Sequence, residues 1–166
     1  MLLASGALVA VLFVINMLPS LAHKDYAMRY GSVEEAGKAV GLNSLPVPTY
    51  FPEGISWPPS FIAAQKKPFA ALVIEFNYKI SDQTALVISQ ASLAGSELHL
   101  QRIKMSEIRQ QSRYNLKGRA AMLQVGLCGD GMSCSRMSWE DKGNFISVLL
   151  MSTPFELIKI TESIVR

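Results

Sequence analysis

From residue 61 onward, apolar and polar side chains alternate with a period of two, which is the spacing of side chains on the two faces of a β-strand. The strands predicted from this pattern cover residues 71–78, 84–92, 98–103, 119–127, 135–140 and 145–151. Alternation of this kind is typical of an antiparallel sheet that packs on one face and meets solvent on the other. We therefore expect the lone carboxylate of Glu75 to face the solvent. Residues 106–117 are polar, and their pattern predicts no element.

The residues before the strands predict a short helix and an extended arm. Ser32 and Glu35 form a capping box at the start of the helix, and Gly41 is a natural place for it to end. Five prolines then occur between residues 46 and 59, and they exclude both a helix and a central strand. Because Tyr50, Phe51 and Trp57 lie among them, we expect an arm that packs on the domain.

The last element is an amphipathic helix that covers the sheet. Thr153 is placed to cap it, Pro154 occupies its first position and Glu156 its third. Its apolar arc is wide and includes Phe155. The sequence thus predicts an α+β fold, in which a twisted antiparallel sheet is covered by a C-terminal amphipathic helix and joined by a short N-terminal helix and a proline-rich arm.

The first 22 residues bear on the compartment of the protein. Residues 2–18 carry no charge, and Ser20 and Ala22 match the small residues of a signal-peptide cleavage site. Cleavage there would leave residues 23–166 as a single exported domain, secreted into the periplasm or the medium. Retention of the segment as a membrane anchor is the alternative, because no basic residue precedes the apolar run. A buried core helix is the third interpretation.

Cys128 and Cys134 are the only cysteines of the chain. An even pair at short spacing predicts a structural disulfide in an oxidising compartment, with free thiols as the alternative. Metal binding is disfavoured because the two histidines are far away in the sequence, and a thioredoxin-type redox pair would have two intervening residues instead of five. If the flanking strands pair, the bond lies at the tip of a hairpin.

A basic cluster lies between residues 102 and 119, although the whole chain has a net charge of only +3. Its six members face a single acid, Glu107, and they are Arg102, Lys104, Arg109, Arg113, Lys117 and Arg119. A solvated strand face is the ordinary interpretation of such a cluster. The functional interpretation is a contact surface for anionic lipid headgroups or a cell-wall polyanion. No RNA-binding or helix-turn-helix pattern accompanies the cluster, so nucleic acid is not an expected partner.

No motif of a known catalytic, metal or cofactor site occurs in the sequence. It contains no GxSxG, HExxH, Walker or GxGxxG pattern. The loop at 129–131 offers one carboxylate where a calcium loop needs several, and His99 is expected to be a surface or packed residue. We therefore expect a protein that is not an enzyme and that uses no cofactor or metal.

Both ends of the domain carry a family resemblance. The two segments are SVEEAGKAVGLNSLPVPTYFPEG, residues 32–54, and MSWEDKGNFISVLLMSTPFELIKITESI, residues 137–164. They resemble an uncharacterised bacterial domain family that is found outside a single membrane helix and is sometimes attached to anti-sigma-factor-like proteins. The resemblance spans about residues 32–165 and is vague between 95 and 117. It implies a lone α+β domain with a twisted antiparallel sheet and no catalytic residues. The zinc-binding module of anti-sigma proteins is lacking here, so a direct hold on a sigma factor is not implied.

Two functions are compatible with these features. The first is a non-enzymatic extracytoplasmic binding or sensory module of the cell envelope, whose partner is an envelope protein or ligand. Its binding surface would be the sheet face opposite the terminal helix, together with the proline-rich arm. The alternative is a carrier of a lipid or other apolar ligand, in a sheet-and-helix cavity lined by methionines. Those methionines are Met105, Met122, Met132, Met137 and Met151.

Overall fold

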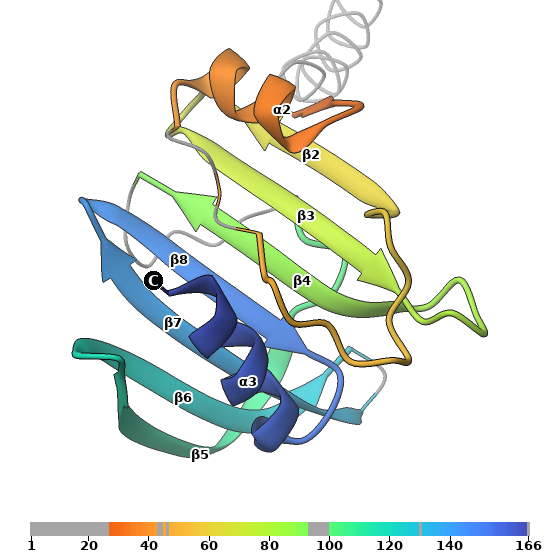
Figure 1. Cartoon of the computed structure of the whole chain (residues 1–166), viewed down its shortest axis with the longest axis vertical. Helices are drawn as coiled ribbons and strands as arrows, with labels where there is room; N and C mark the ends of the chain where they lie inside the picture. Colours follow the sequence, from red (N-terminus) through yellow and green to blue (C-terminus); the bar gives the residue numbers. More distant parts are fainter. Residues whose placement is uncertain (1–26, 43–44, 46, 93–99, 130, 166) are drawn as a thin grey trace, which may run out of the picture.

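The computed structural model describes residues 27–42, 45, 47–92, 100–129 and 131–165. In this part of the chain, antiparallel strands form one sheet of eight, and two helices lie on one face of it (Figure 1). The elements are β1 (Met28–Arg29), α2 (Val33–Val40), β2 (Phe61–Gln65), β3 (Ala71–Asn77), β4 (Thr84–Ala91), β5 (Met105–Leu116), β6 (Arg119–Cys128), β7 (Met132–Asp141), β8 (Asn144–Leu150) and α3 (Pro154–Ile164). The predicted antiparallel, sheet-dominated α+β architecture with a C-terminal helix is confirmed.

The sheet is built from two meanders in the order β1-β2-β3-β4-β8-β7-β6-β5. The first four strands follow one another across one half, and the last four follow one another across the other half. The halves join where β8 pairs with β4, from Leu86 opposite Leu150 to Ala91 opposite Phe145. All eight residues of β4 are buried because this strand lies in the middle of the sheet with both faces covered.

The front face, which carries α2 and α3, holds the larger hydrophobic core. Its large buried side chains come from strands in both halves of the sheet and from α3, and they include Leu72, Ile74, Phe76, Leu86, Ile88, Met137, Val148, Leu157 and Ile160. An isolated helix as short as α2 would be marginal in water. It is stabilised here because Ala36 and Val40 are buried in the same core.

The proline-rich arm also packs on the front face, which confirms that it is not a loose linker. The ring of Phe51 lies 5.1 Å from that of Phe76 on β3, between the ring centroids. The arm also contacts the first turn of α3, where the hydroxyl of Tyr50 donates a hydrogen bond of 2.7 Å to Glu156 Oε2. The arm therefore lies on the same side of the sheet as α3 (Figure 1). The prediction that it joins the opposite face in one binding surface is wrong.

The back face of the sheet is partly covered instead of being solvated. A second apolar cluster lies there, and it contains Ala71, Val73, Val87, Ala91, Cys128, Cys134, Leu149 and Met151. Leu100, Ile103 and Met105 pack against it from a segment that crosses the back of the sheet. Residues 100–103 are not part of a strand, so the strand predicted at 98–103 is wrong in its described part. The apolar residues of this segment cover a face instead of extending the sheet.

Glu75 is fully buried on this back face, in contrast to its predicted exposure. Its carboxylate accepts a hydrogen bond of 3.0 Å from the backbone nitrogen of Arg102 and forms an ion pair with Arg102 Nε. The Arg102 guanidinium also lies over the ring of Phe61, 4.8 Å from its centroid. Strand alternation places Glu75 on the face opposite Ile74 and Phe76. It carries no information about a distant segment that covers the face of Glu75.

The predicted helix ends agree with the structure only in part. The Ser32 side chain accepts from the Glu35 amide at 3.1 Å, and Gly41 ends α2 with a φ of 73°. Thr153 is the N-cap residue of α3, yet its side chain makes no capping hydrogen bond. Phe155 is 75% exposed, so its predicted place in the apolar arc is wrong. It lies two residues before the buried Leu157, and two helical steps turn a side chain by roughly 200°.

The polar segment without a predicted element forms the long edge strand β5. Residues 106–113 are all exposed, and two register shifts interrupt the pairing with β6. At the first shift the backbones of β5 and β6 approach so closely that a Cβ atom on Gly126 would overlap the Glu107 carbonyl oxygen. Charges and bulges on edge strands disfavour pairing with further chains, which accounts for the polar composition of β5.

Candidate functional site

The predicted disulfide joins Cys128 to Cys134 across the tip of the β6–β7 hairpin. The two Cα atoms are 5.8 Å apart, and both residues are fully buried in the back-face cluster. The pairing of the two flanking strands, on which the prediction depended, is confirmed. A structural bond of this kind is compatible with an oxidising compartment.

Removal of the disulfide should destabilise the domain moderately. The bond closes a short loop, with a sequence separation of 6, so the loop entropy that it removes from the unfolded state corresponds to about 2 kcal/mol. We expect the double substitution Cys128→Ala/Cys134→Ala to lower the free energy of unfolding in urea by that amount. The oxidised and chemically reduced wild-type protein should differ in the same direction. Identical urea midpoints for all three samples would contradict this prediction.

Members of the predicted basic cluster form ion pairs with carboxylates: Arg102 with Glu75, Arg109 with Glu107 and Arg119 with Asp141. Lys117 Nζ donates to the Val165 carbonyl oxygen at 2.9 Å, Lys104 is exposed beside β5, and Arg113 is exposed on β5 itself.

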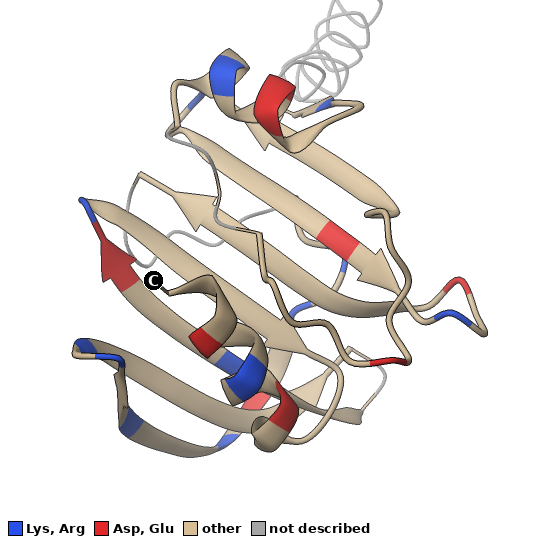
Figure 2. Ribbon diagram, in the orientation of Figure 1, with Lys and Arg blue, Asp and Glu red and all other residues tan. Residues whose placement is uncertain are grey.

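The structure does not gather the six residues on one surface, because Arg102 lies over Phe61 of β2 whereas Arg119 begins β6 near the other edge of the sheet. Figure 2 shows basic and acidic segments interspersed over the ribbon. Contact with an anionic surface stays a prediction.

Arg136 on β7, which does not belong to the predicted basic cluster, is an arginine without a carboxylate partner in the described part of the chain. It is half-buried on the back face, in a row that runs from Gln111 on β5 through Gln124 on β6. Arg136 Nε donates to Gln124 Oε1 at 2.8 Å, and Gln124 Nε2 donates to Gln111 Oε1 at 2.8 Å. Within the described ranges, Arg136 forms no ion pair with a carboxylate.

Burial lowers the pKa of the Arg136 guanidinium from its ordinary value, which means that its positive charge has lost part of its hydration without gaining a counter-charge. An arginine has five N–H donors, and one amide oxygen does not satisfy them. Sequence reasoning missed this residue because Ser135, Arg136 and Met137 read as an ordinary alternating strand. Only the strand pairing places Gln124 beside it, with Gln111 on the next strand.

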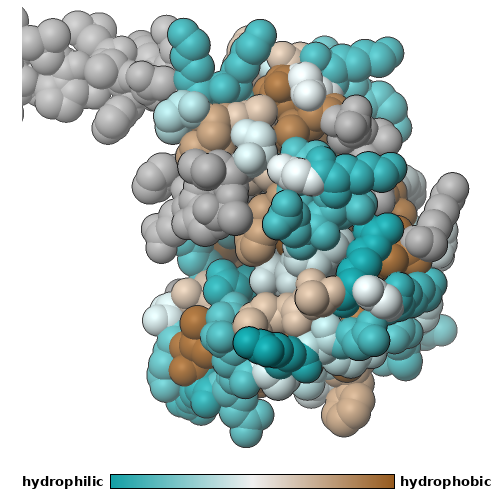
Figure 3. All heavy atoms as spheres, turned by 90° about the vertical axis from the view of Figure 1, so that its left-hand side faces the viewer, coloured by the Kyte–Doolittle hydropathy of each residue, from teal (hydrophilic) through white to brown (hydrophobic). Residues whose placement is uncertain are grey.

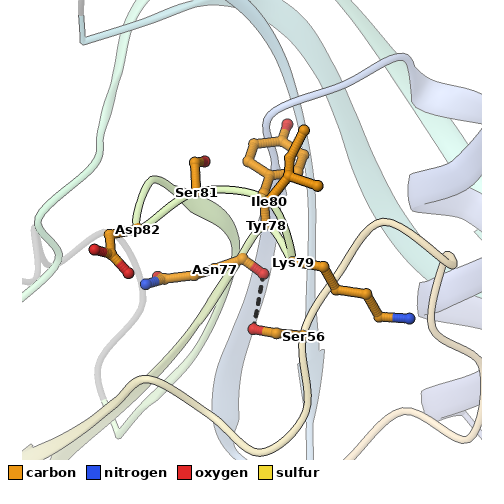
Figure 4. Close-up of a pocket in the computed structure, with 7 residues that line it drawn as sticks. All are labelled: Ser56, Asn77, Tyr78, Lys79, Ile80, Ser81 and Asp82. Atoms are coloured by element: carbon orange, nitrogen blue, oxygen red, sulfur yellow. Dashed lines mark hydrogen bonds between the residues drawn. The ribbon is translucent and has the colours of Figure 1, made fainter.

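A shallow hollow at the β3–β4 turn is a weaker candidate (Figure 4). Ser56, residues 77–79 and residues 80–82 line it. The Ser56 hydroxyl donates to the Asn77 carbonyl oxygen at 3.0 Å, and the Tyr78 hydroxyl donates to the Met151 carbonyl oxygen at 2.7 Å. In Figure 4 the charged ends of Lys79 and Asp82 point away from each other. These polar groups hold the turn in place and do not converge on a common point.

The part of the chain that the structure describes has no group of three or more His, Cys, Asp or Glu side chains that could hold a metal ion. Nor does it contain a helix that is long and apolar enough to cross a membrane. On the face shown in Figure 3, hydrophobic residues form small areas separated by hydrophilic ones. The predicted leader, residues 1–22, and His99 lie outside the described residues.

Comparison with known proteins finds no matching family model, no similar curated protein and no similar solved structure.

Proposed function

We propose that this chain is a non-enzymatic binding module that works outside the cytoplasm, in the cell envelope, and that it binds an acidic protein partner through Arg136 on the back face of the sheet. The predicted leader, the disulfide and the resemblance to domains outside a membrane helix support the compartment. Either form of the leader, cleaved or retained as an anchor, leaves the domain on that side of the membrane.

The observation that carries the proposal is the half-buried charge of Arg136 without a carboxylate beside it. A charge that has lost hydration is costly unless it is paired, and arginine recognises a carboxylate by two parallel hydrogen bonds. An aspartate or glutamate of a partner would supply the missing counter-charge. Gln124, which is itself held by Gln111, fixes the guanidinium from one side, so that the partner need not order it on binding.

The carrier alternative has less support because the methionines expected to line its cavity do not lie together. Met137 is buried in the front core, whereas Met105 and Met151 pack in the back-face cluster. Met132 is exposed at the β6–β7 turn. These residues fill separate parts of the fold instead of lining one cavity.

Binding to an acidic peptide tests the proposed role of Arg136. A charge-assisted hydrogen bond contributes about 1.5 kcal/mol or more, so we expect Arg136→Gln to weaken the binding of a poly-glutamate peptide about tenfold. Arg109→Gln is the matched control, since it removes the same charge from a residue that already pairs with Glu107 at 3.2 Å. It should change the dissociation constant less than twofold. Urea unfolding of both variants shows whether the fold is intact.

Equal losses in the two variants would contradict a specific role for Arg136. Binding of the wild-type protein to vesicles of anionic phospholipid but not to poly-glutamate would favour a membrane surface and contradict the acidic protein partner. Robust turnover in a broad hydrolase screen would contradict a non-enzymatic module.

A further inference from the structure

A second concave site lies on the front face, at the C-terminal end of α3, and it is independent of Arg136. Its volume is about 510 Å³, which lies within the range of about 300 to 1,000 Å³ that is usual for small-molecule sites. The arm contributes Leu45, Val47 and Thr49, the β7–β8 end of the sheet contributes Trp139, Lys142 and Ile146, and α3 contributes Ser163 and Ile164. Figure 1 shows the C-terminal end of α3 in front of β7 and β8.

The wall of this pocket contains a buried donor without an acceptor. Trp139 is 2% exposed, and its Nε1 has no hydrogen-bond partner among the described residues. Buried indole N–H groups in native proteins are nearly always paired, and one left unpaired costs about 1 to 3 kcal/mol. The pairing of β7 with β6 and β8 places Trp139 between Ala121 and Ile146, neither of which has a side-chain acceptor. The missing acceptor would be supplied by a water or by a bound molecule.

The charges of the lining favour an anion. Arg119 and Asp141 neutralise each other through an ion pair of 2.8 Å, so Lys142 leaves the lining with one net positive charge. Lys142 is exposed in the turn between β7 and β8 and forms no ion pair within the described ranges. The Trp139 N–H thus lacks an acceptor, and the nearby ammonium group of Lys142 favours an acceptor with negative charge.

We propose that this pocket binds a small amphipathic carboxylate. Its carboxylate would accept from Trp139 Nε1 and lie in the field of Lys142, while its apolar part would contact Leu45, Val47 and Ile146. A neutral alcohol of the same chain length would fill the same apolar wall but would forgo the attraction to Lys142. The proposal concerns a small-molecule site, and it stands apart from the protein partner assigned to Arg136.

NMR of the two indole N–H groups tests this site with octanoate as the probe. The chain has two tryptophans, and Trp57, which is 61% exposed and does not line the pocket, serves as the internal reference. In the full-length protein, octanoate should shift the Trp139 indole resonance in a saturable manner and leave that of Trp57 unchanged. Octanol should bind more weakly than octanoate. The variant Arg136→Gln should bind octanoate as the wild type does, which separates this site from the proposed function.

The variant Lys142→Asn tests the charge without straining the turn. Lys142 has a φ of 51°, a left-handed conformation that asparagine tolerates better than most residues. We expect it to weaken octanoate binding about threefold, as the loss of an exposed charge interaction does, and to leave octanol binding unchanged. Lys66→Asn, which removes the same charge from an exposed residue outside the pocket, should have no effect. A pocket that holds only water gives no saturable shift with either probe, and that result would overturn the proposal, as would equal binding of octanoate to wild type and Lys142→Asn.

Discussion

Replacing Leu157 by alanine is expected to lower the free energy of unfolding by about 3 kcal/mol, because a fully buried leucine loses its transfer energy and leaves a cavity. Leu157 lies on α3 and packs in the front core with residues of the central strands. The measurement is urea unfolding followed by circular dichroism, with the two-state slope compared between variants. A loss of about 3 kcal/mol is a large part of the free energy of unfolding of a typical domain of this size.

The matched control lies on the same helix. Phe155→Ala removes a larger apolar side chain, but one that is 75% exposed, so its expected effect is below about 0.5 kcal/mol. The pair separates burial from hydrophobicity, since the sequence pattern places both residues in one apolar arc. Equal effects of the two substitutions would contradict the orientation of α3 on the sheet.

Replacing Arg102 by alanine is expected to destabilise the domain by about 2 to 3 kcal/mol. Glu75 is fully buried, and without Arg102 its carboxylate keeps only the 3.0 Å hydrogen bond from the backbone at position 102. Removal of one partner of a buried pair costs about 3 to 5 kcal/mol. We expect less here because the Arg102 side chain is 51% exposed, and water partly screens the pair.

The double variant Glu75→Leu/Arg102→Ala tests the cause of that loss. If an unpaired buried charge destabilises Arg102→Ala, removal of the charge should restore part of the stability, since an apolar side chain is tolerated at a buried position. Arg109→Ala is the control for a charge lost from an exposed pair, and it should cost less than about 0.5 kcal/mol. A double variant less stable than Arg102→Ala would contradict this account.

Arg136 and the pocket at α3 lie on opposite faces of the sheet, and both rest on polar groups whose partners the described chain does not supply. At Arg136 the unmatched group is a half-buried charge, and in the pocket it is the Trp139 N–H with Lys142 nearby. Polar groups on strands and helices of a rigid scaffold are held in position before a ligand arrives. The two sites can therefore be tested separately, by one substitution in each.

The features that depend on near neighbours along the chain could be predicted from the residue pattern. The capping hydrogen bond from Glu35 to Ser32 spans three residues, and the alternation of β3 and β4 and the turn between them are equally local. The disulfide belongs to the same class, because the strands that flank Cys128 and Cys134 are consecutive and pair directly. Periodicity and turn chemistry report on such contacts, since they arise between residues that are close in the sequence.

The features that join distant segments follow from the three-dimensional packing of the chain, and the residue pattern does not predict them. Glu75 is buried because Arg102 and its neighbours cross the back of the sheet, and periodicity places a side chain on a face without showing what lies over that face. Arg136 contacts Gln124 on the neighbouring strand, and Arg119 forms an ion pair with Asp141 on the neighbouring strand. Both contacts depend on strand pairing and are not visible in the residue pattern. The pocket of Trp139 forms where the arm, β7, β8 and α3 meet, and no pattern along the chain encodes that meeting.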